Sequence, residues 1–175
     1  MKWVLRLVGA SMLIALFLLG IGLLLPEGYR VERSIEIAAP AGRVYAAIAS
    51  PRQWQRWSAW GRRDPQMEVD YGGPESGAGA RWTWRSRSAG SGSIEFVDAE
   101  ADRRISYLSR SGLGLRSHGQ LAIDPAGSSV RLSWSQAGEF GANPAARWFG
   151  PFMDRMVGPD FEAGLLNLKA IMEGG

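Results

Sequence analysis

The chain has 175 residues, no cysteine, a single histidine and a formal net charge of +3. Without cysteine it cannot form a disulfide, a zinc thiolate site, a cysteine nucleophile or a cysteine-linked lipid anchor. Of its 20 basic residues Lys2 and Arg6 come first, which leaves 18 against 17 acidic residues from Glu27 onward. This nearly neutral part has no block of like charge, so a nucleic-acid-binding surface is not expected.

An uncharged apolar run extends from Leu7 to Leu25. As a helix it would be about 28 Å long, close to the hydrocarbon thickness of a bilayer. The run ends GLLLPE, without the small-x-small pattern of a signal-peptide cleavage site. It therefore predicts a membrane anchor that contacts the lipid bilayer through Leu7 to Leu25. A cleaved signal peptide and a buried core helix are the alternatives, although the run has no polar face.

The charges that flank the run predict its orientation. Lys2, Arg6 and the terminal amine precede it, whereas the basic residues that follow are interleaved with acidic ones. Positive residues tend to stay cytoplasmic. We therefore expect residues 1–26 to form a cytoplasmic tip and a single-pass anchor in the inner (plasma) membrane. Residues 27–175 should then form one domain on the periplasmic or extracytoplasmic side.

The first element after the anchor alternates between apolar and polar residues over 29–37, which predicts a half-buried strand. Arg33 falls on the apolar face, which suggests either a place at a strand edge or a charge beside a cavity. A helix should begin after Pro40 and end at Ser50. Pro51 suits the first turn of a second short helix. In that helix Trp54, Trp57 and Trp60 would form a stripe on one face.

Strands and turns then alternate, followed by a long helix. We expect strands at 67–71, 81–85, 93–97, 104–108, 115–123 and 130–134, paired antiparallel through tight turns. Val157, Phe161, Leu165 and Leu168 recur at helical spacing, and Pro159 should kink or divide this terminal helix. The order predicts an α+β domain in which a curved antiparallel sheet of about seven strands wraps the terminal helix.

Several segments of the chain resemble the START-like (SRPBCC, helix-grip) superfamily, in particular its membrane-anchored bacterial members of the polyketide cyclase/dehydratase-like group. The likeness rests on 31–40 (VERSIEIAAP), the tryptophan cluster at 54–60, the turn at 72–74 (GGP), 77–80 (GAGA) and 157–165 (VGPDFEAGL). It covers nearly the whole domain. It implies a helix-grip fold with a pocket between the concave sheet and the long helix. The superfamily includes lipid carriers, hormone receptors and cyclases, so the fold alone does not choose a function.

The chain is rich in tryptophan, with 8 residues of this type. Indole rings offer large apolar surfaces with one N–H donor, so they could either wall an apolar cavity or simply fill the core. Methionines could add an adaptable lining. The candidate ligand-binding residues are Trp54, Trp57, Trp60, Tyr71, Trp82, Trp84, Trp134, Met153, Met156 and Phe161.

Catalytic chemistry is harder to place. His118 lies on the polar face of its strand, no Ser-His-acid triad can be assembled, and no metal site or cofactor is expected. If a general acid or base exists, Asp154 or Asp160 is the candidate, although a structural role near the helix kink suffices for both. Non-covalent binding of a hydrophobic small molecule or lipid is therefore the expected function. A polyketide cyclase/dehydratase-like enzyme and an envelope protein-interaction module remain alternatives.

Overall fold

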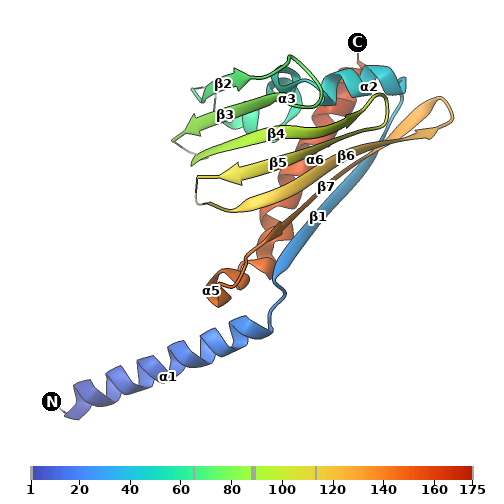
Figure 1. Ribbon diagram of the computed structural model, residues 1–175. Coiled ribbons are helices and arrows are strands. Elements are labelled where there is room, and N and C mark those ends of the chain that lie inside the picture. Colours follow the sequence, from blue (N-terminus) through green and yellow to red (C-terminus); the bar gives the residue numbers. More distant parts are fainter. Residues whose placement is uncertain (1, 65, 88–89, 113, 175) are drawn as a thin grey trace.

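A seven-stranded antiparallel sheet curves around one long helix in the computed structural model, which describes residues 2–64, 66–87, 90–112 and 114–174 (Figure 1). The strands lie in the order β1-β7-β6-β5-β4-β3-β2, so the first and last strands in sequence pair with each other. The predicted α+β helix-grip architecture is confirmed. The strands are β1 (Gly28–Ile37), β2 (Glu68–Gly72), β3 (Arg81–Ser86), β4 (Gly90–Glu100), β5 (Arg104–Ser111), β6 (Arg116–Ala126) and β7 (Ser129–Glu139).

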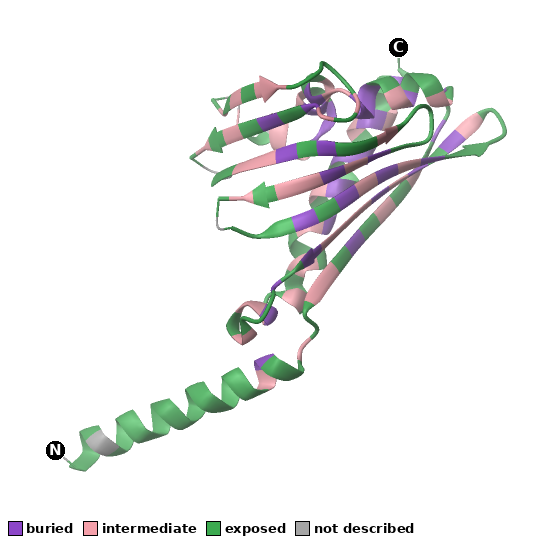
Figure 2. Ribbon diagram, in the orientation of Figure 1, coloured by how far each residue is buried: buried purple, intermediate pink, exposed green. Residues whose placement is uncertain are grey.

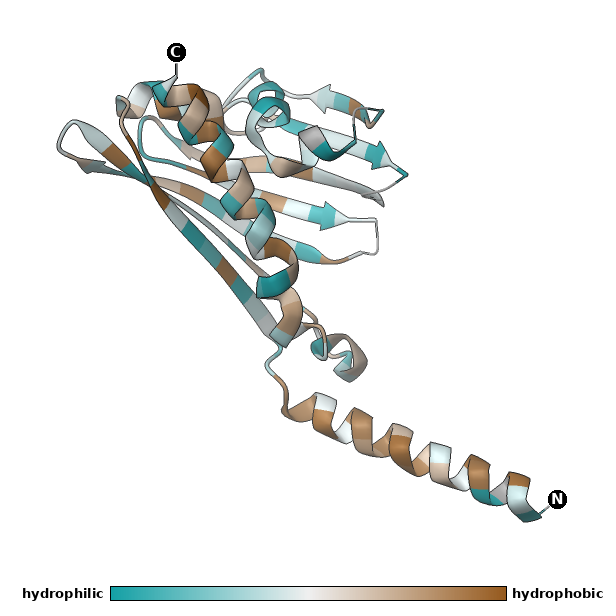
Figure 3. Cartoon of the chain, turned by 180° about the vertical axis from the view of Figure 1, so that it is seen from behind, coloured by the Kyte–Doolittle hydropathy of each residue, from teal (hydrophilic) through white to brown (hydrophobic). Residues whose placement is uncertain are grey.

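Helices α2, α3, α4 and α6 gather on the concave side of the sheet, whereas α5 lies beyond the end of the sheet beside α1, and α1 extends away from the domain (Figures 1 and 3). The long helix α6 follows directly on a short 3-10 turn, η1, and packs mainly against β1. The helices are α1 (Lys2–Leu24), α2 (Ala41–Ile48), α3 (Pro51–Trp57), α4 (Ala59–Arg63), α5 (Pro144–Arg147) and α6 (Met153–Glu173), and η1 spans Gly150–Phe152.

Strand β1 follows the predicted alternation. Val31 and Ile37 are buried, whereas Glu32 and Glu36 face solvent (Figure 2). Arg33 lies on the helix-facing side of this edge strand. Its guanidinium binds Asp154 at 2.8 Å and Glu162 at 2.6 Å, both on α6. The ion pairs of Arg33 therefore link the edge of the sheet to the long helix.

The tryptophan stripe differs from the prediction. Trp54 and Trp57 lie on α3, but the helix ends there, and Ser58 begins α4 by accepting a hydrogen bond from the Gly61 N–H. Trp60 therefore belongs to a separate helix. A serine that can cap a new helix turns the chain, and this outweighs the spacing of three that the indoles share.

Helix α6 runs through Pro159 as one helix, so of the predicted kink or division, the division is wrong. Proline removes one helical hydrogen bond and normally bends or breaks a helix. Here Arg33 binds Asp154 before the proline and Glu162 after it, which holds both sides of the interruption to the sheet. The predicted apolar stripe is present, with Phe161, Leu165 and Leu168 buried.

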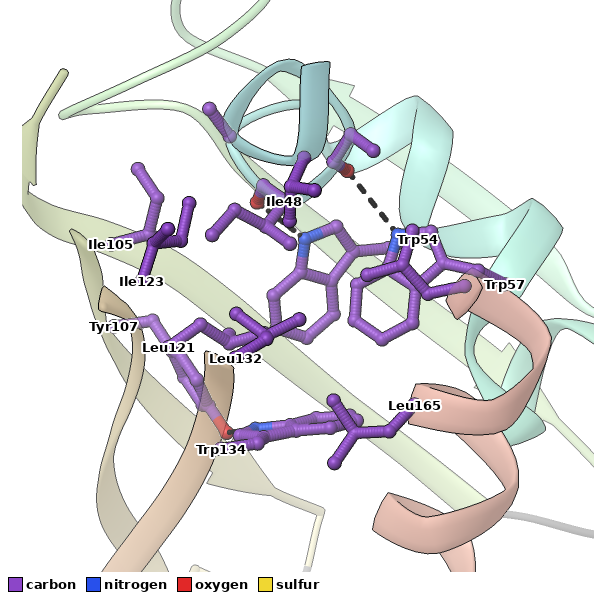
Figure 4. Packing of buried hydrophobic residues seen from close by; sticks show 14 of the residues in the cluster. Ile48, Trp54, Trp57, Ile105, Tyr107, Leu121, Ile123, Leu132, Trp134 and Leu165 are labelled. Carbon is purple, nitrogen blue, oxygen red and sulfur yellow. Dashed lines mark hydrogen bonds between the residues drawn. The ribbon is translucent and has the colours of Figure 1, made fainter. Parts of the chain in front are cut away.

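The indoles of α3 are anchored by the helix before them. Trp54 Nε1 donates to the Ile48 carbonyl at 2.7 Å, and Trp57 Nε1 donates to the Ala47 carbonyl at 3.2 Å (Figure 4). Both carbonyls lie at the C-terminal end of α2, where a helix leaves carbonyls without intrahelical partners. Each indole therefore meets its hydrogen-bonding need inside the core while it terminates a neighbouring helix.

Helix α1 lies outside this core. Its apolar side chains are exposed, and within the described residues it is the one helix long and apolar enough to cross a membrane. A signal sequence near the N-terminus would share both properties. Residues 25–27 alone separate the end of α1 from the start of β1.

Candidate ligand-binding site

A cavity of about 190 Å³ lies between the concave face of the sheet, helices α3 and α4, and the N-terminal half of α6. Its walls are mostly apolar, with a few polar groups among them. It is lined by Trp54, Gln55, Ser58, Trp60, Met67, Trp82, Trp84, Ile94, Ser109, Gln136, Val157 and Asp160.

A cluster of packed aromatic side chains adjoins this cavity, and Trp54 belongs to both. Phe161 of α6 stacks on Trp134 of β7 with ring centroids 4.0 Å apart and planes inclined by 5°. Trp54 and Trp57 contact the same indole edge-on, at 5.5 and 5.3 Å. Packed side chains therefore fill part of the space between the sheet and the helix (Figure 4). The cavity occupies another part of that space.

A chain of hydrogen bonds leads from this core to the cavity wall. Trp134 Nε1 donates to the Tyr107 hydroxyl at 2.8 Å, and that hydroxyl donates to Gln136 Oε1 at 3.0 Å. Gln136 Nε2 in turn donates to the Tyr29 hydroxyl at 3.3 Å. Burial raises the pKa of Tyr107, so its hydroxyl keeps its proton at physiological pH. The chain therefore fixes the amide of Gln136 at the edge of the cavity.

A glycine makes room for Tyr107. Gly119 of β6 lies directly opposite Tyr107 of β5, and a Cβ atom on Gly119 would overlap the tyrosine ring. The ring can therefore lie flat across the neighbouring strand and reach Gln136 on β7. This close approach requires glycine at that position.

One carboxylate lies among the described lining residues, and it is already paired. Asp160 Oδ2 accepts from Trp60 Nε1 at 3.0 Å and from Arg63 Nη1 at 3.2 Å, and its Oδ1 forms an ion pair with Arg63. Both oxygens are therefore occupied. The pairing ties α4 to α6 across one side of the cavity.

The structure divides the predicted site residues into three groups. Trp54, Trp60, Trp82 and Trp84 line the cavity. Trp57, Trp134 and Phe161 lie behind it in the core. The others lie elsewhere: Tyr71 packs under the guanidinium of Arg52 at 4.5 Å, Met153 is half-buried against the core, and Met156 is 60% exposed.

Four polar lining residues were missing from the prediction, Gln55, Ser58, Ser109 and Gln136, and the last two lie on strands. Ser109 shares a strand face with Tyr107, and Gln136 shares one with Trp134, because side chains two apart on a strand point the same way. A polar residue on an inward face is the signal that could have identified both.

The candidate acids and the histidine have other surroundings. His118 is exposed on the outer side of β6. The hydrogen bonds that Asp154 accepts from Arg33 hold its pKa below the usual range, so it stays ionised near neutral pH. Within the described ranges, no cluster of three or more His, Asp and Glu side chains is placed to hold a metal ion.

The sheet, the gripped helix and the cavity between them define a helix-grip protein. A family model described as "Polyketide cyclase / dehydrase and lipid transport" matches residues 29–173, and the chain belongs to this family. A search of the curated proteins found no match.

Solved structures share the fold at low sequence identity. A protein from Chromobacterium violaceum is 18% identical with a TM-score of 0.58, over 85% of this chain and 99% of that one. A norcoclaurine synthase point mutant of Thalictrum flavum, solved with a transition-state analogue, is 13% identical with a TM-score of 0.64, over 83% and 94%. The Aha1 dimer of Colwellia psychrerythraea is 13% identical with a TM-score of 0.57, over 82% and 96%.

Proposed function

We propose that the protein is a membrane-anchored member of its family that binds a small hydrophobic molecule, or the end of a lipid, in the cavity between sheet and helix. The observation that carries the proposal is a partly enclosed cavity with indole walls and a few fixed polar groups, the usual make-up of a small-molecule site. Trp54, Trp60, Trp82 and Trp84 would supply most of the apolar contact. The family description, which includes lipid transport, agrees with such a ligand.

The size of the cavity restricts the ligand. An engineered apolar cavity of about 150 Å³ holds benzene, and this one measures about 190 Å³. It therefore suits one or two rings, or a short stretch of an alkyl or isoprenoid chain. A whole lipid would leave most of its length outside. Affinity would come mainly from apolar burial, at about 25 cal/mol per Å² before entropic costs.

Gln136 is the polar group best placed to orient the ligand. Its side-chain nitrogen carries two N–H donors, of which one reaches Tyr29. The other could donate to a carbonyl or hydroxyl oxygen of the ligand. A ligand with one oxygen at the end of an apolar body would therefore be preferred over a pure hydrocarbon.

Binding is favoured over the cyclase or dehydratase alternative by the state of Asp160. A general acid or base must exchange a proton with the ligand. Both oxygens of Asp160 are paired with Trp60 or Arg63, so this carboxylate has a structural role in linking α4 to α6.

Helix α1 would place the cavity beside the bilayer in which apolar ligands concentrate. Its length, apolar surface and exposure suit a single span, and the positive residues before it favour a cytoplasmic N-terminus. A tethered cavity gains effective concentration over a free one.

Native mass spectrometry of the full chain, released from detergent micelles after incubation with a membrane lipid extract, tests the proposal. The wild type should retain an apolar adduct. Val157→Trp, which fills the cavity, should lose it, whereas Leu166→Trp, on an exposed part of the same helix, should keep it. A wild type without an adduct, or a Val157→Trp variant that retains it equally, would contradict the proposal.

A further inference from the structure

An exposed apolar patch lies where the sheet domain meets α1. It consists of Phe149, Phe152 and Met156, which are 58%, 52% and 60% exposed. These residues follow α5 and run through η1 into the start of α6. Three large apolar side chains held so close together in water are unfavourable unless something covers them.

Helix α5 is fixed against the C-terminal end of α1 (Figure 1). Arg147 is almost completely buried there, and it binds Glu27 at 2.8 Å while donating to the Leu23 carbonyl at 3.3 Å. That carbonyl belongs to the last turn of α1, where a cation is favoured by the helix dipole. The patch therefore has a defined position relative to the apolar helix.

A glycine allows α1 and α5 to approach each other closely. Gly22 is buried, and a Cβ atom there would overlap the Pro144 carbonyl. One turn earlier, the Leu18 carbonyl accepts a hydrogen bond from Trp148 Nε1 at 3.2 Å. Without a side chain at position 22, the surface of α1 is open enough for the Trp148 indole to reach the backbone.

The position of the Trp148–Leu18 contact along the axis of α1 indicates what could cover the patch. Leu18 lies six residues before the end of α1 at Leu24, which corresponds to about 9 Å along the helix axis. Trp148 is therefore level with the apolar part of α1, and Phe149 follows it directly. Any bilayer that covers α1 down to Leu18 also reaches this side of the domain.

We propose that the patch of Phe149, Phe152 and Met156 inserts into the lipid surface beside α1, as a second membrane contact; this rests on the proposed anchoring. Trp148 would lie at the edge of this lipid contact, and tryptophan is enriched at membrane–water interfaces. The insertion would add to the contacts between α5 and α1 in setting the orientation of the domain at the membrane. Val157, the next residue after Met156, lines the cavity, so the α6 wall of the cavity begins where the lipid contact ends.

The chain has no cysteine, so single cysteines can carry a spin label without background. We suggest the full chain in phosphatidylcholine–phosphatidylglycerol vesicles, labelled at Phe152→Cys, and at Leu166→Cys on α6 as a control of similar exposure. The label at 152 should be more accessible to oxygen than to a water-soluble nickel complex. The label at 166 should show the opposite. A label at 152 that faces water, or that is shielded from both reagents by protein, would overturn the proposal.

Two further measurements distinguish a failure of the patch proposal from a failure of the proposed anchoring by α1. A label at Leu13→Cys, in the middle of α1, should lie in lipid. If that label lies in lipid while the label at residue 152 faces water, the patch proposal fails and the anchoring proposal stands. Gly22→Leu should move the label at 152 toward water by displacing α5. Gly20→Leu adds the same side chain where no atom lies within 4 Å, and should leave it unchanged. An equal response to both substitutions would contradict the role of Gly22.

Discussion

Phe161 lies face to face on the indole of Trp134, with centroids 4.0 Å apart and planes inclined by only 5°. This contact joins the middle of α6 to β7 inside the buried core. Both side chains are completely buried. The long helix is therefore held to the sheet by a specific ring-on-ring contact as well as by apolar burial.

Phe161→Ala should lower the free energy of unfolding by about 3–5 kcal/mol, the usual cost of removing a buried phenylalanine ring. Denaturant unfolding of the full chain in detergent, followed by tryptophan fluorescence, would measure it. Leu166→Ala, at an exposed position on the same helix, should change the value by less than about 0.5 kcal/mol. Equal effects would mean that the stacked ring contributes no more than a surface side chain.

Gly119→Ala should destabilise the protein by about 1–3 kcal/mol, because the added methyl group forces the Tyr107 ring to move. The displaced tyrosine would also lose its bond to Gln136. In a Tyr107→Leu background the same substitution should cost much less. A double-mutant cycle by denaturant unfolding checks this. Additive costs would show that the glycine is needed for another reason.

The pair between Arg33 and Asp154 should make stability depend on acid pH. Arg33 lowers the pKa of Asp154, so the folded protein gains stability above the unfolded value of about 3.9. That gain is lost as the pH falls through the folded pKa. The stability difference between wild type and Arg33→Met should therefore be largest near neutral pH and shrink below about pH 4. Unfolding curves between pH 3 and 7 would show it; a difference that grows in acid would contradict it.

A fragment that begins at Glu27 should fold without α1. The β1–β7 ladder begins at Gly28 opposite Glu139, and the buried cluster contains no residue of α1. Near-ultraviolet circular dichroism should therefore retain the tryptophan signal of the full chain. The patch is exposed and would have no lipid to cover it in the fragment, so Phe149→Ser with Phe152→Ser should improve the solubility of the fragment. Aggregation that persists with both substitutions would contradict the boundary.

The sequence patterns were sufficient for the fold because each of them is local. Alternation over 29–37 and the four-residue spacing from Val157 to Leu168 report directly which face of an element is buried. Trp60 was misplaced for a local reason too, since Ser58 caps a new helix. Helix α6 continues through Pro159, and Arg33, on a strand far away in the sequence, binds carboxylates on both sides of that proline. No spacing along the helix itself could indicate these ion pairs.

The candidate site was harder to predict from the sequence than the fold. The abundance of tryptophan indicated an aromatic interior, but whether each ring fills the core or lines a cavity depends on contacts between distant segments. Trp54 and Trp57 belong to one short helix, yet only Trp54 reaches the cavity. The Trp148–Leu18 contact joins residues 130 apart and has no local signature.

The brief connection at residues 25–27 limits where this protein can act. Fully extended, it spans about 10 Å. Under the proposed anchoring the domain cannot swing out to a second membrane or follow a diffusing acceptor. It would act as a receptor held close to the bilayer surface, and any partner that delivers or removes the ligand would have to reach that surface.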